Sequence, residues 1–127
     1  MSFTATVASS VTSTDLSVSE TKTVTSDAKT VIAEPIAAST TNREIALNID
    51  VSAAKLILFK ADGPLTIKTN SSSVPDDTLT LVAGVGQYSY EGAFYTALLD
   101  TDVTKIFVTN GTLAIVNLQI LVMQDIV

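Results

Sequence analysis

Short runs in which apolar and polar residues alternate recur along this chain, and they restrict its fold more than any other feature. Ile45, Leu47 and Ile49 alternate with small or polar residues, as expected of a strand with one buried face. Valine, isoleucine and threonine, which favour strands, dominate these runs. No stretch has the three-to-four-residue apolar spacing of a long amphipathic helix. The sequence therefore predicts an all-β protein with little helix.

Turn-forming residues divide the chain into about eight to ten short strands. Residues 56–60 and 65–69 flank a turn that contains Asp62-Gly63, and residues 103–109 and 112–122 flank Asn110-Gly111. Both dipeptides favour tight turns, so we expect each pair of runs to form a hairpin. Regularly spaced short strands indicate a β-sandwich or a closed barrel. The unequal strands and loops favour a single antiparallel, jelly-roll-like β-sandwich.

The last predicted strand is apolar on both faces. One face carries Ala114, Val116, Leu118, Ile120 and Val122, and the other carries Leu113, Ile115, Asn117, Gln119 and Leu121. A strand of this kind is expected to be covered on both sides. Pro35 lacks an amide donor, so the strand that contains it is expected at a sheet edge or to end there.

The first residues differ from the rest of the chain. Residues 1–14 are mainly serine, threonine, alanine and valine. The alternation of Phe3, Ala5 and Val7 permits a strand where an edge is offered, but the apolar bulk is too small to pack alone. We therefore expect an extended N-terminal arm over residues 1–14, followed by one β-sandwich domain over residues 15–127.

Composition limits the partners. Apolar residues make up 46% of the chain, yet no run approaches the ~20 residues of a membrane helix, so the excess must be buried within the fold or between chains. The net charge is −6 and Arg43 is the one arginine, so nucleic acid is a poor partner. The N-terminus has no basic start or apolar run of a secretory signal, so assembly in a cytoplasm is expected.

The sequence lacks the usual catalytic side chains. It has no histidine and no cysteine, so the common general base and the thiol nucleophile are both missing, and we expect no enzyme and no cofactor. Asp76-Asp77 and Asp100-Thr101-Asp102 are interpreted as polar loops, although Asp100 and Asp102 leave calcium binding open. Gly84-Val85-Gly86 is interpreted as a turn, because no helix follows it to hold a phosphate.

Four aromatic residues lie close together at Tyr88, Tyr90, Phe94 and Tyr95. Tyr88 and Tyr90 would share one side of a strand, and exposed there they would suit a sugar-binding platform. The more common role of such a pair is to cover the sandwich or a contact between subunits.

Five stretches in recognisable order carry a family resemblance: residues 44–55, 62–70, 75–81, 99–110 and 118–125. Together they resemble small virion proteins encoded among the head genes of tailed bacteriophages, especially capsid decoration (cement) proteins. The resemblance covers about residues 20–125, and residues 84–98 depart from it.

The resemblance implies a β-sandwich that clamps neighbouring capsomers from outside the head. It implies a homo-oligomer, more readily a trimer than a dimer, whose partner is the major capsid protein. Such a protein would be located on the phage head surface in the virion and assembled in the host cytoplasm. The alternatives are a tail or neck component of the virion and a carbohydrate-binding or adhesin module that uses Tyr88 and Tyr90.

Overall fold

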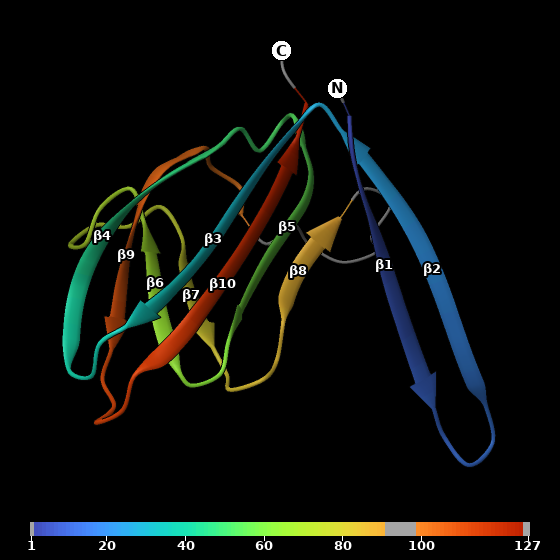
Figure 1. Cartoon of the computed structure of the whole chain (residues 1–127), viewed down its shortest axis with the longest axis horizontal. Helices are drawn as coiled ribbons and strands as arrows, with labels where there is room; N and C mark the ends of the chain where they lie inside the picture. The colour runs from blue at the N-terminus through green and yellow to red at the C-terminus, as the bar shows by residue number, and fades with distance from the viewer. Residues whose placement is uncertain (1, 91–98, 126–127) are drawn as a thin grey trace.

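The computed structural model describes residues 2–90 and 99–125, and these residues form ten strands and no helix (Figure 1). The strands are β1 (Phe3–Thr12), β2 (Ser17–Ser26), β3 (Ala28–Ile36), β4 (Thr40–Ile49), β5 (Ala54–Ala61), β6 (Leu65–Thr69), β7 (Thr78–Leu81), β8 (Gln87–Tyr90), β9 (Val103–Asn110) and β10 (Val116–Gln124). The prediction of an all-β protein is confirmed. Within the described part of the chain no helix is long and apolar enough to cross a membrane.

The strands from β3 onward form two packed antiparallel sheets, which confirms the predicted β-sandwich. One sheet has the order β3-β10-β5-β8 and is called the β3 sheet below. The other has the order β4-β9-β6-β7 and is called the β4 sheet. The hydrogen-bonded pairs include β3 with β10, β4 with β9, β5 with β8 and β6 with β7, so strands far apart in the sequence lie side by side.

A single apolar core fills the space between the two sheets, because alternate residues of each strand point inward. Phe59 and Leu118 of the β3 sheet and Ile67, Leu81 and Ile106 of the β4 sheet are fully buried. Burying a side chain of this size contributes about 1.5–3 kcal/mol, so these positions supply the main stabilisation of the domain.

The predicted cover over both faces of the last strand is largely wrong: β10 begins at Val116, so Leu113 and Ile115 lie exposed in the preceding connection, and Asn117 and Gln119 are exposed on the outer face. Val116, Leu118, Ile120 and Val122 face the core. On the opposite face Met123 is only 1% exposed and lies in a second, smaller apolar cluster outside the sandwich. The expected position of Pro35 is confirmed, because β3 is an edge strand.

Both predicted two-strand hairpins are wrong. Strand β5 belongs to the β3 sheet and β6 to the β4 sheet, and β9 and β10 are likewise in different sheets. Each connection therefore crosses from one sheet to the other. At Gly63 the glycine is needed for space: a Cβ atom there would lie 2.7 Å from Cγ2 of the buried Val116. The turn dipeptide signals a tight change of direction, but not the sheet in which the next strand lies.

We predict that Gly63→Ala lowers the free energy of unfolding by about 1–3 kcal/mol, because the new methyl group collides with Val116. Urea denaturation measures the effect. Gly111→Ala is the matched control, since a Cβ at Gly111 meets nothing within 4 Å. Combining Gly63→Ala with Val116→Ala should restore part of the lost free energy of unfolding, because it removes the collision. Equal losses of unfolding free energy for Gly63→Ala and Gly111→Ala would contradict the packing argument.

The N-terminal residues form a hairpin of β1 and β2, and an extended arm over residues 1–14 is not confirmed. The two strands pair from Phe3 with Ser26 to Thr12 with Ser17, so the expected boundary at residue 14 falls in the hairpin tip. The tip is closed by a hydrogen bond from the Ser13 N–H to the Leu16 carbonyl at 2.8 Å. Figure 1 shows the base of the hairpin against the sandwich and its tip pointing away from it.

Candidate docking surfaces

Four connections that cross between the sheets meet at one end of the sandwich, called the loop end below. It consists of residues 37–39, 62–64, 82–86 and 111–115. These residues carry one charge, on Asp62. They also expose the aliphatic side chains of Val82, Val85, Leu113 and Ile115, with Leu113 93% exposed. Exposed aliphatic side chains gathered without charges are typical of an interaction surface.

The buried side chain of Asn110 fixes two of these connections together. Its Nδ2 donates to the carbonyls of Ile36 at 3.0 Å, Ala37 at 3.2 Å and Ala114 at 2.8 Å. Its Oδ1 accepts from the N–H of Thr112 at 3.0 Å and from its hydroxyl at 2.7 Å. One amide therefore holds the end of β3 and the β9–β10 connection in fixed positions. The exposed Leu113 and Ile115 consequently lie on an ordered loop.

The other two connections are also tied down. Asp62 accepts hydrogen bonds from the backbone and side-chain N–H groups of Asn117, both at 2.8 Å. These bonds, the side-chain one first, hold the pKa of the Asp62 carboxyl below its usual value. Gly84, whose φ is +74°, donates its N–H to the Ala61 carbonyl at 2.8 Å. The loop end is thus ordered before it meets any partner, which reduces the entropy lost on binding.

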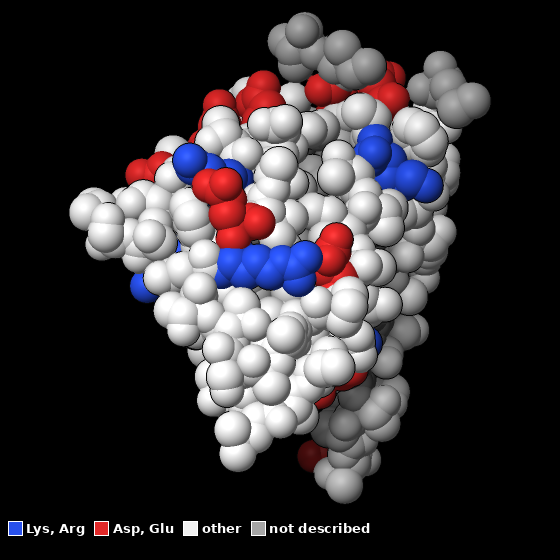
Figure 2. All heavy atoms as spheres, turned by 60° about the vertical axis from the view of Figure 1, so that its left-hand side comes forward, with Lys and Arg blue, Asp and Glu red and all other residues white. Residues whose placement is uncertain are grey.

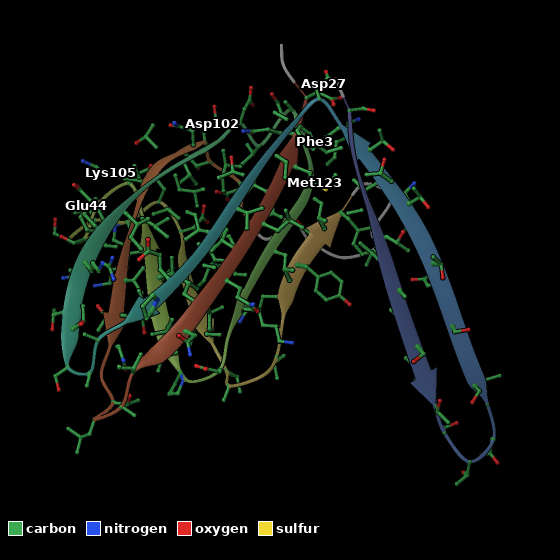
Figure 3. The ribbon with its side chains drawn as sticks, in the orientation of Figure 1. Phe3, Asp27, Glu44, Asp102, Lys105 and Met123 are labelled. Atoms are coloured by element: carbon green, nitrogen blue, oxygen red, sulfur yellow. The ribbon has the colours of Figure 1, made fainter. Side chains whose placement is uncertain are left out.

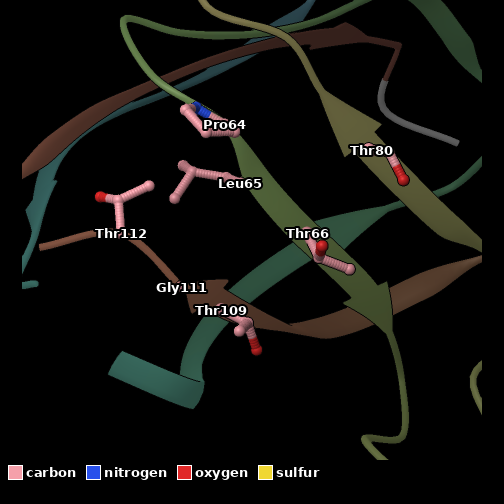
Figure 4. A pocket seen from close by; sticks show the side chains of 7 residues that line it. All are labelled: Pro64, Leu65, Thr66, Thr80, Thr109, Gly111 and Thr112. Carbon is pink, nitrogen blue, oxygen red and sulfur yellow. The ribbon is translucent and has the colours of Figure 1, made fainter. Parts of the chain in front are cut away.

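A hollow of about 280 Å³ lies beside the β9–β10 connection (Figure 4). It is lined by Pro64, Leu65, Thr66, Thr80, Thr109, Gly111 and Thr112. Thr109, Thr66 and Thr80 are register partners on adjacent strands, so the floor of the hollow is a row of threonines. The hollow is uncharged and has the size to receive a side chain of a partner.

We predict that Asn110→Ala lowers the free energy of unfolding by about 2–3 kcal/mol, because it leaves buried carbonyl groups without a donor. Chemical denaturation measures the loss, and hydrogen exchange should show faster exchange in residues 37–39 and 111–115. The control is Asn48→Ala, because Asn48 is exposed on β4. An Asn110→Ala loss no larger than that of Asn48→Ala would contradict the role of Asn110.

The opposite end of the sandwich is strongly acidic and is called the acid end below. Seven of the nine aspartates of the chain lie there: Asp27, Asp50, Asp76, Asp77, Asp100, Asp102 and Asp125. Figure 3 shows Asp27 and Asp102 at this end, and in Figure 2 acidic atoms gather toward one end while the other is mostly uncharged. The only exposed large aliphatic side chain among its described residues is Val74.

Asn70 connects the loops of the acid end. It has a left-handed backbone with φ of 66°, which asparagine tolerates better than most residues. Its Nδ2 donates to Asp76 Oδ2 at 2.6 Å and to the Asp102 carbonyl at 2.8 Å. Its Oδ1 accepts from the Thr104 N–H at 2.8 Å. Asn70 thus orders the β6–β7 loop against the start of β9.

The structure places the calcium candidates Asp100 and Asp102 in this acid end, where their oxygens accept protein hydrogen bonds. Asp102 Oδ1 accepts from the Val51 N–H at 3.0 Å, and Asp100 Oδ1 accepts from the Thr101 hydroxyl at 3.0 Å. Across residues 2–90 and 99–125, no group of three or more acidic side chains is arranged to hold a metal.

Asp77 is the described carboxyl of this end whose pKa is raised. Burial raises the pKa of Asp77 above its usual value, and the nearby charge of Asp100 acts in the same direction. Its Oδ2 is buried and accepts no hydrogen bond. Two carboxylates cannot bond to each other until one of them holds a proton, so the charged form of Asp77 is disfavoured in the folded chain.

We predict that Asp77→Asn raises the free energy of unfolding at pH 7, by up to about 1 kcal/mol, because the amide can donate toward Asp100. The folded-state pKa of Asp77 is raised, so its contribution to stability is present in acid and is lost as the pH rises through that pKa. The advantage of Asp77→Asn should therefore shrink as the pH falls toward 4. Denaturation at several pH values measures it, and a destabilised variant at pH 7 would contradict the assignment.

A third surface lies where the N-terminal hairpin crosses the outer face of the β3 sheet. Val24, Leu56 and Met123 are buried there, and Phe3 and Tyr90 pack against them. Figure 3 shows Phe3 and Met123 at this crossing. The ammonium of Lys29 lies 5.0 Å from the centre of the Phe3 ring, a distance that suits a cation–π contact.

The aromatic pair predicted on one side of a strand is found on β8. The rings of Tyr88 and Tyr90 are stacked, with centroids 6.0 Å apart and planes 16° from parallel. Tyr90 packs against the hairpin cluster, and burial first, then the charge of Glu20, raises its pKa. The pair thus covers part of the molecule, which favours a packing role over an open sugar platform. Phe94 and Tyr95 lie outside the described residues.

Comparisons with known proteins do not supply a function. No protein-family model, no curated protein and no solved structure is similar enough to this chain to count as a match. The function is therefore inferred from the surfaces.

The sequence correctly places Gly84-Val85-Gly86 in a turn, but it does not show that the four connections of the loop end lie together. The feature of the sequence that could have indicated this surface is the presence of Val85 and Leu113, both exposed, in turns where polar residues are usual.

Proposed function

We propose that this chain is a non-catalytic capsid decoration (cement) protein of a tailed bacteriophage, which docks on the assembled head through its loop end. The observation that carries the proposal is the separation of charge from exposed apolar surface. Seven aspartates lie at the acid end, whereas the loop end carries one charge and four exposed aliphatic side chains. Such a molecule is suited to bind a large partner by one end and to present the other end to solvent.

The strand order supports a jelly-roll topology and, with it, a viral structural role. The pairs β3·β10, β4·β9, β5·β8 and β6·β7 join each strand of the first half of the sandwich to one of the second half. A jelly roll, the architecture of viral capsid and lectin domains, also has eight strands divided between two sheets, so this pairing supports assigning the fold to it. The architecture alone does not decide between these two uses, so the proposed capsid role rests on the exposed apolar surface of the loop end.

The mechanism follows from mass action. A protein that binds the assembled head but not its separated subunits stabilises the assembled state, by about 2.7 kcal/mol per site at a free concentration of 100 Kd. No catalytic group is required, and the sequence has neither histidine nor cysteine. The proposed partner is the major capsid protein, on the head surface of the virion. A homo-oligomer, a trimer rather than a dimer, would place several loop ends on the shell together.

We predict that the double substitution Leu113→Asp and Ile115→Asp weakens binding to heads at least about tenfold, because it introduces charges at the centre of the docking surface. Co-sedimentation with heads of the phage that carries the gene measures binding. Val74→Asp is the matched control, since Val74 is 79% exposed at the acid end. Equal binding of both variants would contradict docking by the loop end, and no binding by the unmodified protein would contradict the function.

A further inference from the structure

The distal half of the N-terminal hairpin, residues 10–19, projects past the sandwich and is called the overhang below (Figure 1). Its exposed aliphatic residues are Val11, Leu16 and Val18, which are 72%, 65% and 53% exposed. Val11 and Val18 are register partners and so lie on the same face of the hairpin. A two-stranded hairpin is only marginally stable by itself, so packing against another surface would stabilise the overhang.

The hairpin has two chemically different faces. The face that includes Val11 and Val18 also carries Ser9, Glu20 and Lys22, and at the base it ends in Ala5, Val7 and Val24, which pack on the outer face of the β3 sheet. The other face consists of threonine and serine with one alanine: Thr4, Thr6, Ala8, Ser10, Thr12, Ser17, Ser19, Thr21, Thr23 and Thr25. This face therefore packs on the β3 sheet at its base, and beyond Ser9, Glu20 and Lys22 it presents Val11 and Val18 uncovered in the overhang.

A groove of about 270 Å³ remains open between the hairpin base and the β3 sheet. Its apolar walls include Ala5 and Val7 of the hairpin and Leu56, Leu58, Tyr88 and Leu121 of the sheet. The overhang cannot enter this groove in its own chain, because β1 itself forms one wall and continues away from it at about 3.3 Å per residue. An overhang from a second chain has no such restriction.

Charge also matches the overhang to this face. Across the outward positions of β3, β5, β8 and β10, the charged residues are Lys29 and Lys60, both positive. The overhang carries a single charge, and it is negative, on Asp15. A second copy of the chain thus offers the uncovered aliphatic face with the complementary charge.

We propose that the overhang of one copy packs in the groove of a neighbouring copy, with Val11 and Val18 against Leu58 and Tyr88. The contact continues the packing that the hairpin base makes within its own chain. It deepens the self-association of the proposed function by naming the two surfaces, and it forms without the head. A failure of head binding and a failure of this contact are therefore separate results.

The first test is the solution mass of the isolated full chain, measured by light scattering after size exclusion. The unmodified protein should exceed one chain of 13.3 kDa, and Val11→Asp combined with Val18→Asp should raise the dissociation constant at least about tenfold. Ser10→Asp combined with Ser19→Asp places the same charges on the opposite face and should leave the mass unchanged. A monomeric unmodified protein, or equal effects of the two double variants, would overturn the proposal.

The second test locates the contact and uses the absence of cysteine from the sequence. A Val11→Cys chain is mixed with a Leu58→Cys chain, and oxidation should link them into a mixed dimer. Because the two thiols are on different chains, the link can form only between copies. Ser10→Cys mixed with Leu58→Cys should link far less, and equal linking of the two mixtures would reject the assigned face. Circular dichroism checks that each variant keeps its strands.

Discussion

The buried amide of Asn110 is the interaction on which the arrangement of the loop end depends. The β9–β10 connection must pass from one sheet to the other, and its backbone groups cannot all pair within a strand ladder. Asn110 provides the missing donors and acceptor, holding the Ile36, Ala37 and Ala114 carbonyls together with Thr112. With this network in place, aliphatic side chains can stand on an ordered surface, and the sandwich acquires two chemically different ends.

The sequence predicts the local pattern well and the long-range pairing poorly. Alternation identifies the strands, but the cover predicted over the second face of the last strand is found only at its end, where Leu121 and Met123 lie in the cluster outside the sandwich. The turn dipeptides at Gly63 and Asn110 are misleading, because a tight turn is compatible both with a hairpin and with a passage between sheets. The positions of the aspartates in the sequence likewise do not reveal that seven of them meet, since that depends on which strand ends are neighbours.

Three surfaces follow from this topology, and each is given a separate role. The loop end concentrates exposed aliphatic side chains and is proposed to face the head, while the charged acid end is proposed to face solvent. The hairpin lies at the side, where it is proposed to join neighbouring copies through Val11 and Val18. This division places self-association and docking on different residues, such as Val11 and Leu113, so substitutions can separate them.

The most direct test of the central claim is an electron cryo-microscopy map of heads to which the purified protein has been added. Docking by the loop end predicts density on the outer surface of the shell, with residues 111–115 and 82–86 against the shell and Asp50, Asp102 and Asp125 facing solvent. Density in which the acid end contacts the shell would contradict docking by the loop end. A map with no added density, at protein concentrations that saturate a binding site, would contradict the proposed function itself.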